Sequence, residues 1–292
     1  MPRTPLAMKP PSLDSEALAR TVATALDEDL GEAGDLTTEA MIAEGAAATA
    51  HFVARADLVV AGLVVAREVF SQLDRSLVFT ESRADGDHAA TGDRLASIAG
   101  NARAILRGER TALNFLMRMS GIATLASRAV AEIAGTGAVI LDTRKTAPGL
   151  RMLDKYAVAA GGATNHRLGL YDAIMIKDTH LGVAGTIGDA VARSLATGVE
   201  AARITVEVGT IEQLTEAIEA GAGRALLDNM DLAGLRRAVE VGKGRIVLEA
   251  SGGLRPGNLR PVAETGVDCL SLGALTHSAP AADIAMEMEA AG

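Results

Sequence analysis

Short apolar runs alternate with helical segments through the second half of the chain. Six runs predict strands: "AVILD" (138–142), "AIMIKD" (173–178), "ITVEVG" (204–209), "RALLDN" (224–229), "RIVLEAS" (245–251) and "VDCLSLG" (267–273). The last four leave room for one helix and two loops between neighbours, which is the rhythm of a parallel α/β sheet or barrel. Because six strands are fewer than the eight of a closed barrel, the pattern favours an incomplete α/β barrel. A doubly wound sheet is the alternative, but no G-x-G-x-x-G follows a first strand.

The first half of the chain has a different pattern. A capped helical segment over 12–30 is followed by a turn-rich stretch, then by a strand and a helix within 47–73. Gly/Asp turns divide the next segment, 76–100, into two or three short strands. Apolar residues then recur at helical spacing from Asn101 to about Ile133. We therefore expect a small α+β unit with antiparallel strands, joined to the second half by a long helix.

Composition narrows the class of protein. Of the 292 residues 49% are hydrophobic but only 2% are aromatic, which suits helices packed on parallel strands. The net charge is −9 with no block of Lys and Arg, so a nucleic-acid surface is not expected. Cys269 is the only cysteine, which rules out an internal disulfide and fits a cytoplasmic location. We find no signal peptide and no run of about 18 apolar residues, so no membrane segment is expected. Residues 1–12, with four prolines, are interpreted as an ordered arm or a loose tail.

Polar and small residues follow the predicted strands. In chain order they are Asp142, Arg144 and Lys145; Lys177 and Asp178; Glu207; Asp228 and Asn229; Glu249, Ser251, Gly252 and Gly253; and Gly273. In α/β barrels the chemistry lies at the carboxyl ends of the strands, so these residues predict one site. The first strands end in cations, the middle strands in carboxylates, and the last two in small residues that can expose backbone N–H groups to a phosphate. Ordinary turns are the alternative explanation for the glycines.

This order of charges suggests three kinds of ligand. A multiply anionic substrate would suit the cations, a divalent cation the carboxylates, and a phosphorylated co-substrate the glycines. Arg144 can clamp a carboxylate with two hydrogen bonds, and Lys145 acts as a point charge. Asn165, His166 and Arg167 precede the strand that ends in Lys177 and add further donors.

Several segments resemble the quinolinate phosphoribosyltransferase family, also called nicotinate-nucleotide pyrophosphorylase (carboxylating). They are "GDLTT", "GERTALNFLMRMSGIAT", "LDTRKTAPGLRMLDKYAV", "NHRLGLYDAIMIKD", "EASGG" and "SLGALTHSAPAAD", which together span most of the chain from 34 to 283. The resemblance implies two domains, an N-terminal α/β sandwich and an incomplete (open) α/β barrel. We place them at residues 1–120 and 121–279, with a helix over 280–292 packing back on the first.

The resemblance also implies the activity: transfer of phosphoribose from phosphoribosyl pyrophosphate to quinolinate with decarboxylation, giving nicotinate mononucleotide for NAD biosynthesis. It implies a homodimer with shared active sites and a requirement for Mg²⁺. Residue by residue, quinolinate would be held by Arg144, His166, Arg167, Lys177 and Arg110 of the neighbouring subunit. Phosphoribosyl pyrophosphate and Mg²⁺ would be bound by Lys145, Glu207, Asp228, Ser251, Gly252, Gly273 and His277, with Glu207 and Asp228 as the metal ligands, directly or through water. Lys145, Lys177, Glu207 and Asp228 would be catalytic.

Two positions depart from the family pattern, and three other functions remain open. Ala163 stands where the family usually has a third glycine, and Thr179 where it usually has Asn; neither change removes a charged group. The alternatives are a molybdenum-transport-associated homologue of the same fold, a metal-dependent phosphate-barrel lyase with Lys177 as Schiff-base residue, and a non-catalytic scaffold. Retention of Arg144, His166, Arg167 and Lys177 argues against the first.

Overall fold

The computed structural model describes residues 13–289, which fall into two compact units. One contains the described residues of 13–127, 147–162 and 279–289, and the other contains 128–146 and 163–278. The predicted domain limits, 1–120 and 121–279, stay a prediction. The N-terminal arm proposed for residues 1–12 lies outside the described residues.

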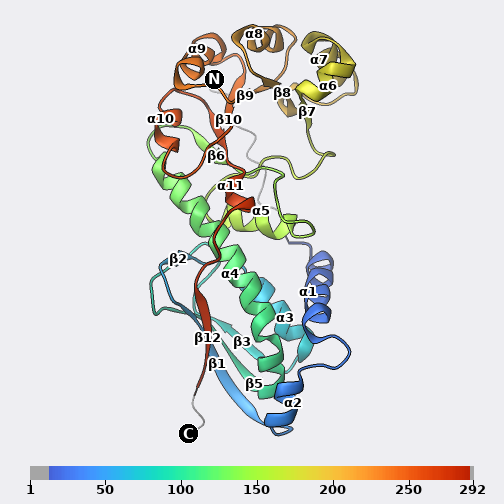
Figure 1. Cartoon of the computed structure of the whole chain (residues 1–292), viewed down its shortest axis with the longest axis vertical. Coiled ribbons are helices and arrows are strands. Elements are labelled where there is room, and N and C mark those ends of the chain that lie inside the picture. The colour runs from blue at the N-terminus through green and yellow to red at the C-terminus, as the bar shows by residue number, and fades with distance from the viewer. Residues whose placement is uncertain (1–12, 290–292) are drawn as a thin grey trace. The chain divides into compact units, whose positions relative to one another are not determined.

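The first unit is built on a four-stranded antiparallel sheet with the order β12-β1-β5-β3 (Figure 1). Its strands are β1 (Ala47–Ala54), β3 (Val78–Glu81), β5 (Arg94–Asn101) and β12 (Ile284–Met288), and β2 (Leu58–Val59) pairs separately with β4 (His88–Ala89). Its helices are α1 (Ser15–Leu30), α2 (Leu36–Met41), α3 (Leu63–Leu73) and α5 (Arg151–Ala160). The long helix α4 (Ala102–Glu132) begins in this unit and ends in the other, as the periodicity predicts.

An aromatic cluster forms the core of this sheet and helix arrangement. Phe52 of β1, Phe70 of α3 and Phe79 of β3 have ring centroids 6.0–6.1 Å apart. Gly108 of α4 lies so close to Phe70 that an added Cβ would be 2.6 Å from the ring, so a glycine is needed for this approach. The unit is thus a layer of helices on an antiparallel sheet, which confirms the predicted α/β sandwich.

The end of the chain corrects one prediction. Within the described residues, the helix expected over 280–292 is wrong, because Ile284–Met288 forms strand β12 and pairs with β1 in the register Ala50↔Met288 to Ala54↔Ile284. The segment "IAMEM" contains good helix formers, but the edge of β1 offers unpaired backbone groups, and this tertiary pairing overrides local propensity.

The second unit holds a six-stranded sheet with the order β6-β11-β10-β9-β8-β7, and every pair is parallel. The strands are β6 (Val139–Leu141), β7 (Ile174–Ile176), β8 (Ile204–Val208), β9 (Arg224–Asp228), β10 (Val247–Ser251) and β11 (Cys269–Ser271). The connecting helices are α6 (Asp178–Ala184), α7 (Ile187–Ala196), the 3₁₀ turn η1 (Ala201–Arg203), α8 (Ile211–Glu219), α9 (Leu232–Gly242), α10 (Leu259–Ala263) and α11 (Ala274–His277).

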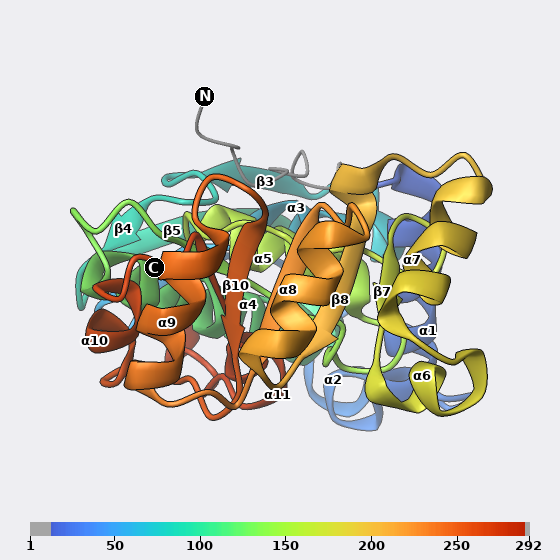
Figure 2. The same ribbon diagram turned by 90° about the horizontal axis from the view of Figure 1, so that it is seen from above.

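This sheet curves without closing. In the described part of the chain the end strands β6 and β7 do not pair, although Thr164 bridges to Leu141 and extends the β6 side. Helices α7, α8 and α9 lie along one face of the strands (Figure 2). All six strands predicted from the sequence are present, and the incomplete α/β barrel is confirmed.

Candidate active site

The strand register places the polar residues of the barrel on one face. Thr205 pairs with Arg224, Glu207 with Leu226, and Ser251 with Asp228. Because side chains alternate along a strand, these residues point to the face away from the covering helices. The same register adds Glu249, opposite Cys269, to this face. The intervening residues, such as Val206, Leu227 and Leu248, are fully buried and apolar. One face thus packs the core, and the other carries the polar side chains together with buried Leu226, Val247 and Cys269.

Three of the predicted residues meet where β6 and β11 end. A Cβ added to Gly273 would lie 2.9 Å from Lys145 Cδ and 3.2 Å from His277 Cδ2 and Nε2. The Thr276 hydroxyl donates a hydrogen bond of 2.8 Å to the Lys145 carbonyl and so ties the two loops together. Lys145 and His277 are exposed, and the missing Cβ of Gly273 lets both side chains approach its backbone closely.

Another group forms where β9 and β10 end. The Asn229 backbone N–H donates to the Ser251 carbonyl at 2.9 Å, and Asn229 Nδ2 donates to Asp228 Oδ2 at 2.9 Å. Gly252 has φ +105°, and a Cβ there would lie 2.1 Å from Asn229 Oδ1, so only glycine fits. Asn229 itself adopts φ +53°. Asp228, Ser251 and Gly252 are therefore held together by a residue that the sequence reasoning noted at a strand end and gave no role.

The ends of β7 and β8 carry an ion pair. Lys177 Nζ lies 3.0 Å from Glu207 Oε2, and the Lys177 side chain is 43% exposed. The register puts Glu207 beside Leu226 and thus diagonal to Asp228 on the same face. No group of three or more His, Cys, Asp or Glu side chains suited to a metal is found within residues 13–289. Two carboxylates are still a donor set that Mg²⁺ accepts when substrate phosphates and water complete its coordination.

Two arginines lie close together at this end of the barrel. Arg144 Nε is buried without a hydrogen-bond partner among the described residues. Arg167 is 8% exposed, and its Nη1 donates to the Ala173 carbonyl at 2.8 Å. Burial and the charge of Arg144 lower the pKa of the Arg167 guanidinium, and the Asp172 carboxylate offsets this only in part. Like charges placed together in this way favour binding of an anion.

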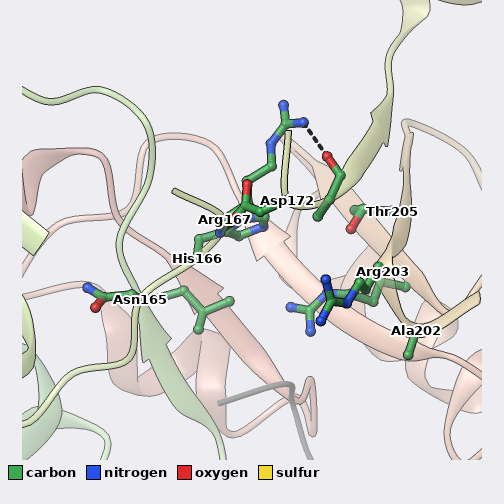
Figure 3. Close-up of a pocket in the computed structure, with 10 residues that line it drawn as sticks. Asn165, His166, Arg167, Asp172, Ala202, Arg203 and Thr205 are labelled. Atoms are coloured by element: carbon green, nitrogen blue, oxygen red, sulfur yellow. Dashed lines mark hydrogen bonds between the residues drawn. The ribbon is translucent and has the colours of Figure 1, made fainter. Parts of the chain in front are cut away.

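The loop that carries His166 and Arg167 is anchored by a buried acid at the end of β6. Asp142 is fully buried; its carboxylate accepts hydrogen bonds from Asn165 Nδ2 at 2.8 Å and from the His166 backbone N–H at 2.7 Å. His166 and Arg167 line a small cavity of about 40 Å³ together with Arg203 and Thr205 (Figure 3). A cavity of this size holds a few water molecules at most.

A polar cluster fills the barrel beneath this loop. Glu249 is fully buried; it contacts Arg224 Nη2 at 3.0 Å and His166 Nε2 at 3.4 Å, and it accepts a hydrogen bond from the Ser271 hydroxyl. Burial raises the pKa of the Glu249 carboxyl, but His166, Arg224 and Ser271 outweigh it and hold the pKa at about 2. Burial raises the pKa of the neighbouring Cys269 thiol to about 12, so this cysteine is not a nucleophile at neutral pH.

The predicted residues of the barrel are thus brought to the ends of its strands, whereas Arg110 is not in this unit. Arg110 lies on α4 in the first unit, where its side chain is exposed. Sequence reasoning missed the anchoring roles of Asp142, Asn229 and Glu249. Each of them follows or ends an apolar run, which is the only signal the sequence offers.

Comparison with known proteins identifies the two halves of the chain. Residues 35–120 match the model of the quinolinate phosphoribosyl transferase N-terminal domain, and residues 122–287 match that of the C-terminal domain. A curated relative from Nicotiana glauca, a mitochondrial quinolinate phosphoribosyltransferase [decarboxylating], is 40% identical over 97% of this chain and 86% of its own length. A chloroplastic nicotinate-nucleotide pyrophosphorylase [carboxylating] from Arabidopsis thaliana has the same identity and coverage.

Solved structures agree with these matches. The nicotinate-nucleotide pyrophosphorylase of Francisella tularensis is 34% identical, with a TM-score of 0.91 over 97% of this chain and 100% of its own. NadC from Streptococcus pyogenes is 35% identical, with a TM-score of 0.91 over 96% and 99% of the two chains. Among residues 13–289, no helix is both long and apolar enough to cross a membrane.

Proposed function

Because this chain belongs to the quinolinate phosphoribosyltransferase family, we propose that it transfers phosphoribose from phosphoribosyl pyrophosphate to quinolinate. The transfer is coupled to decarboxylation and gives nicotinate mononucleotide, carbon dioxide and pyrophosphate, a step of NAD biosynthesis. This is the activity that the names of its relatives state.

The observation that carries the proposal is the pair of arginines, Arg144 and Arg167. Quinolinate is a pyridine dicarboxylate, so two guanidiniums that repel each other in the free protein gain a dianion between them. His166, which precedes Arg167 in the chain, and Lys177 are proposed as further donors. Nicotinate has one carboxylate fewer and would leave part of this charge uncompensated.

The other predicted residues suit the donor substrate. Lys145, Gly273 and His277 lie together at one corner, and Ser251 and Gly252 lie at another, so phosphate groups could bind backbone N–H groups, the Lys145 ammonium and the His277 ring. Glu207 and Asp228 would hold Mg²⁺, directly or through water, and their carboxylates face the sugar from adjacent strands. The metal would neutralise charge on the pyrophosphate.

These residues divide the reaction into two parts. The ring nitrogen of quinolinate attacks the anomeric carbon while the bond to pyrophosphate breaks, and Lys145 stabilises the leaving oxygens. Glu207 and Asp228 stabilise the positive charge that develops on the sugar. The quaternised ring then loses its 2-carboxylate as carbon dioxide, because the ring's positive charge stabilises the electron pair left on carbon. A proton from solvent water then bonds to that carbon and gives nicotinate mononucleotide. Lys177 Nζ is engaged in an ion pair with Glu207 at 3.0 Å, which disfavours a Schiff-base role.

The assembly belongs to the same proposal. Arg110 is exposed on α4, and we propose that it reaches the quinolinate pocket of a second subunit in a homodimer. A mixture of two inactive variants, Arg110→Ala and Lys145→Ala, tests this: shared sites predict that mixed dimers recover part of the activity. Independent sites would leave the mixture inactive.

The free thiol of Cys269 supports a cytoplasmic location.

The direct test is a turnover assay with purified protein, phosphoribosyl pyrophosphate and Mg²⁺, with quinolinate or nicotinate as acceptor. We expect pyrophosphate and carbon dioxide in equal amounts with quinolinate and neither product with nicotinate. Turnover of nicotinate, or pyrophosphate release without carbon dioxide, would contradict the proposal. A borohydride-trapped adduct on Lys177 would favour the lyase alternative instead.

A further inference from the structure

Glu249 is a buried carboxylate of the barrel to which the proposed reaction assigns no role. Glu249 lies within strand β10 and has no solvent exposure. Its neighbours come from three other segments: Arg224 begins β9, Ser271 ends β11, and His166 lies in the loop before β7. A fixed negative charge at this depth would be costly without such partners.

The His166 ring has a polar neighbour at each of its nitrogens. Its Nδ1 accepts a hydrogen bond of 2.7 Å from the Arg167 backbone N–H. A nitrogen that accepts cannot carry the ring proton of a neutral imidazole, so that proton belongs on Nε2. Nε2 is the atom that faces Glu249 Oε2, at 3.4 Å. The carboxylate thus stands where it selects one tautomer and one orientation of the ring.

Arg167 depends on the same arrangement. Its backbone N–H is bonded to the His166 ring, and the His166 backbone N–H is bonded to Asp142. If the ring turned, the backbone of Arg167 would lose its partner and its guanidinium would shift relative to Arg144. Glu249 therefore acts on the anion pocket from behind, through His166.

We propose that Glu249 is a positioning residue for the acceptor pocket: it fixes the His166 ring through Nε2 and thereby the placement of Arg167, while Arg224 balances its charge. The inference rests on the proposed function for its kinetic test. Carboxylates that orient a histidine in this way are common behind metal-binding histidines, and here the oriented group serves an organic anion. Glu249 is fully buried and acts through His166, so we assign it a positioning role and not a catalytic one.

The kinetic test uses variants that leave no unpaired buried charge. Arg224→Met/Glu249→Met removes both charges and the acceptor for His166, whereas Arg224→Met/Glu249→Gln removes the charges but keeps an acceptor oxygen. We expect the first variant to raise the KM for quinolinate about tenfold or more, since small displacements of binding groups have effects of up to about 100-fold. The KM for phosphoribosyl pyrophosphate should stay within about twofold, and the Gln variant should recover most of the loss.

A control separates positioning from general weakening of the barrel. Asp268 accepts a hydrogen bond from the backbone N–H of Leu248, next to Glu249, and pairs with Lys243 at 2.9 Å, whereas the partners of Glu249 are Arg224, Ser271 and His166. Asp268→Asn therefore weakens the same region and should leave both KM values unchanged. An equal rise in the two KM values, no rise in either, or the same rise in Asp268→Asn would overturn the proposal.

A spectroscopic measurement keeps the inference independent of the activity. The chain has five histidines, so the ring ¹⁵N signals of His166 can be assigned by their loss in His166→Asn. We expect a protonated Nε2 with a downfield proton in the wild type, shifted upfield in Arg224→Met/Glu249→Met. A proton on Nδ1 instead, or no shift in the variant, would overturn the inference even if quinolinate is turned over. If the wild-type protein does not turn over quinolinate but its His166 signals show the expected change in the variant, only the proposed function is contradicted.

Discussion

The barrel arranges charges in opposite ways in its interior and at its mouth. In the interior, Arg224 and Glu249 are a cation and an anion 3.0 Å apart, and both are buried. At the mouth, Arg144 and Arg167 are two cations, close enough for one to lower the pKa of the other. The opposite charges in the interior neutralise each other, whereas the two like charges at the mouth would be neutralised by a bound anion. We therefore expect loss of an interior charge to affect stability first, and loss of a mouth charge to affect turnover first.

The largest expected effect is on the interior pair. Glu249→Ala leaves the guanidinium of Arg224 buried without its carboxylate, and should lower the free energy of unfolding by about 3–5 kcal/mol. Urea unfolding followed by circular dichroism measures this change. Arg224→Met/Glu249→Met is the matched control, since it removes both charges and should recover most of the loss. If Glu249→Ala unfolds at the wild-type urea concentration, the interior charges are not coupled.

The pH dependence of stability sharpens the same point. The folded protein holds the pKa of Glu249 at about 2, below its ordinary value of 4.5. The unfolded chain therefore binds the proton more readily, and the stabilisation is complete above about pH 5 and is lost as the pH falls toward 2. We expect a loss on the order of 3 kcal/mol over this range from this carboxyl alone. Acid unfolding monitored for the wild type and Arg224→Met/Glu249→Met should show a shallower decline in the variant. Parallel curves would contradict the prediction.

The mouth should respond in the reverse way. Arg167→Met removes one of two repelling cations, so the free energy of unfolding should rise or stay within about 1 kcal/mol of the wild type. Turnover of quinolinate should fall about 100-fold or more, because a charged group that binds a substrate carboxylate is lost. Steady-state assays and urea unfolding on the same preparation measure both quantities. A variant that unfolds more easily yet keeps near-full turnover would reverse the comparison.

The sequence predicts the mouth better than the interior. Arg144, Lys177, Glu207 and Asp228 each follow a run of apolar residues, and parallel strands bring their ends to one edge, so their proximity follows from the fold class. Glu249 also ends a predicted strand, but its partners Arg224 and His166 depend on register and on a loop that crosses the open side of the sheet. The order of apolar and polar residues along the chain does not indicate the strand register that brings Arg224 next to Glu249.

The same limit explains the error at the end of the chain. Residues 284–288 were expected to be helical, yet they form β12 because the edge of β1, more than 200 positions earlier, offers a partner. Local propensity is a weak guide where a distant strand edge competes. The prediction of α4 succeeded because its apolar residues recur at helical spacing. The six barrel strands were predicted correctly because each is a short apolar run that is buried in the sheet.

The smallest expected effect concerns the partly exposed ion pair between Lys177 and Glu207. Lys177 and Glu207 are as close as Arg224 and Glu249, at 3.0 Å, but the Lys177 side chain is 43% exposed. Water screens the pair, so Lys177→Met should change the free energy of unfolding by less than about 1 kcal/mol. Turnover of quinolinate should still fall by about tenfold or more, since the ammonium is a proposed donor to quinolinate. Lys243→Met, which breaks an exposed pair with Asp268 away from the site, is the control and should lower neither quantity appreciably. If Lys177→Met were as destabilising as Glu249→Ala, distance rather than burial would govern these pairs, and the distinction between interior and mouth would fail.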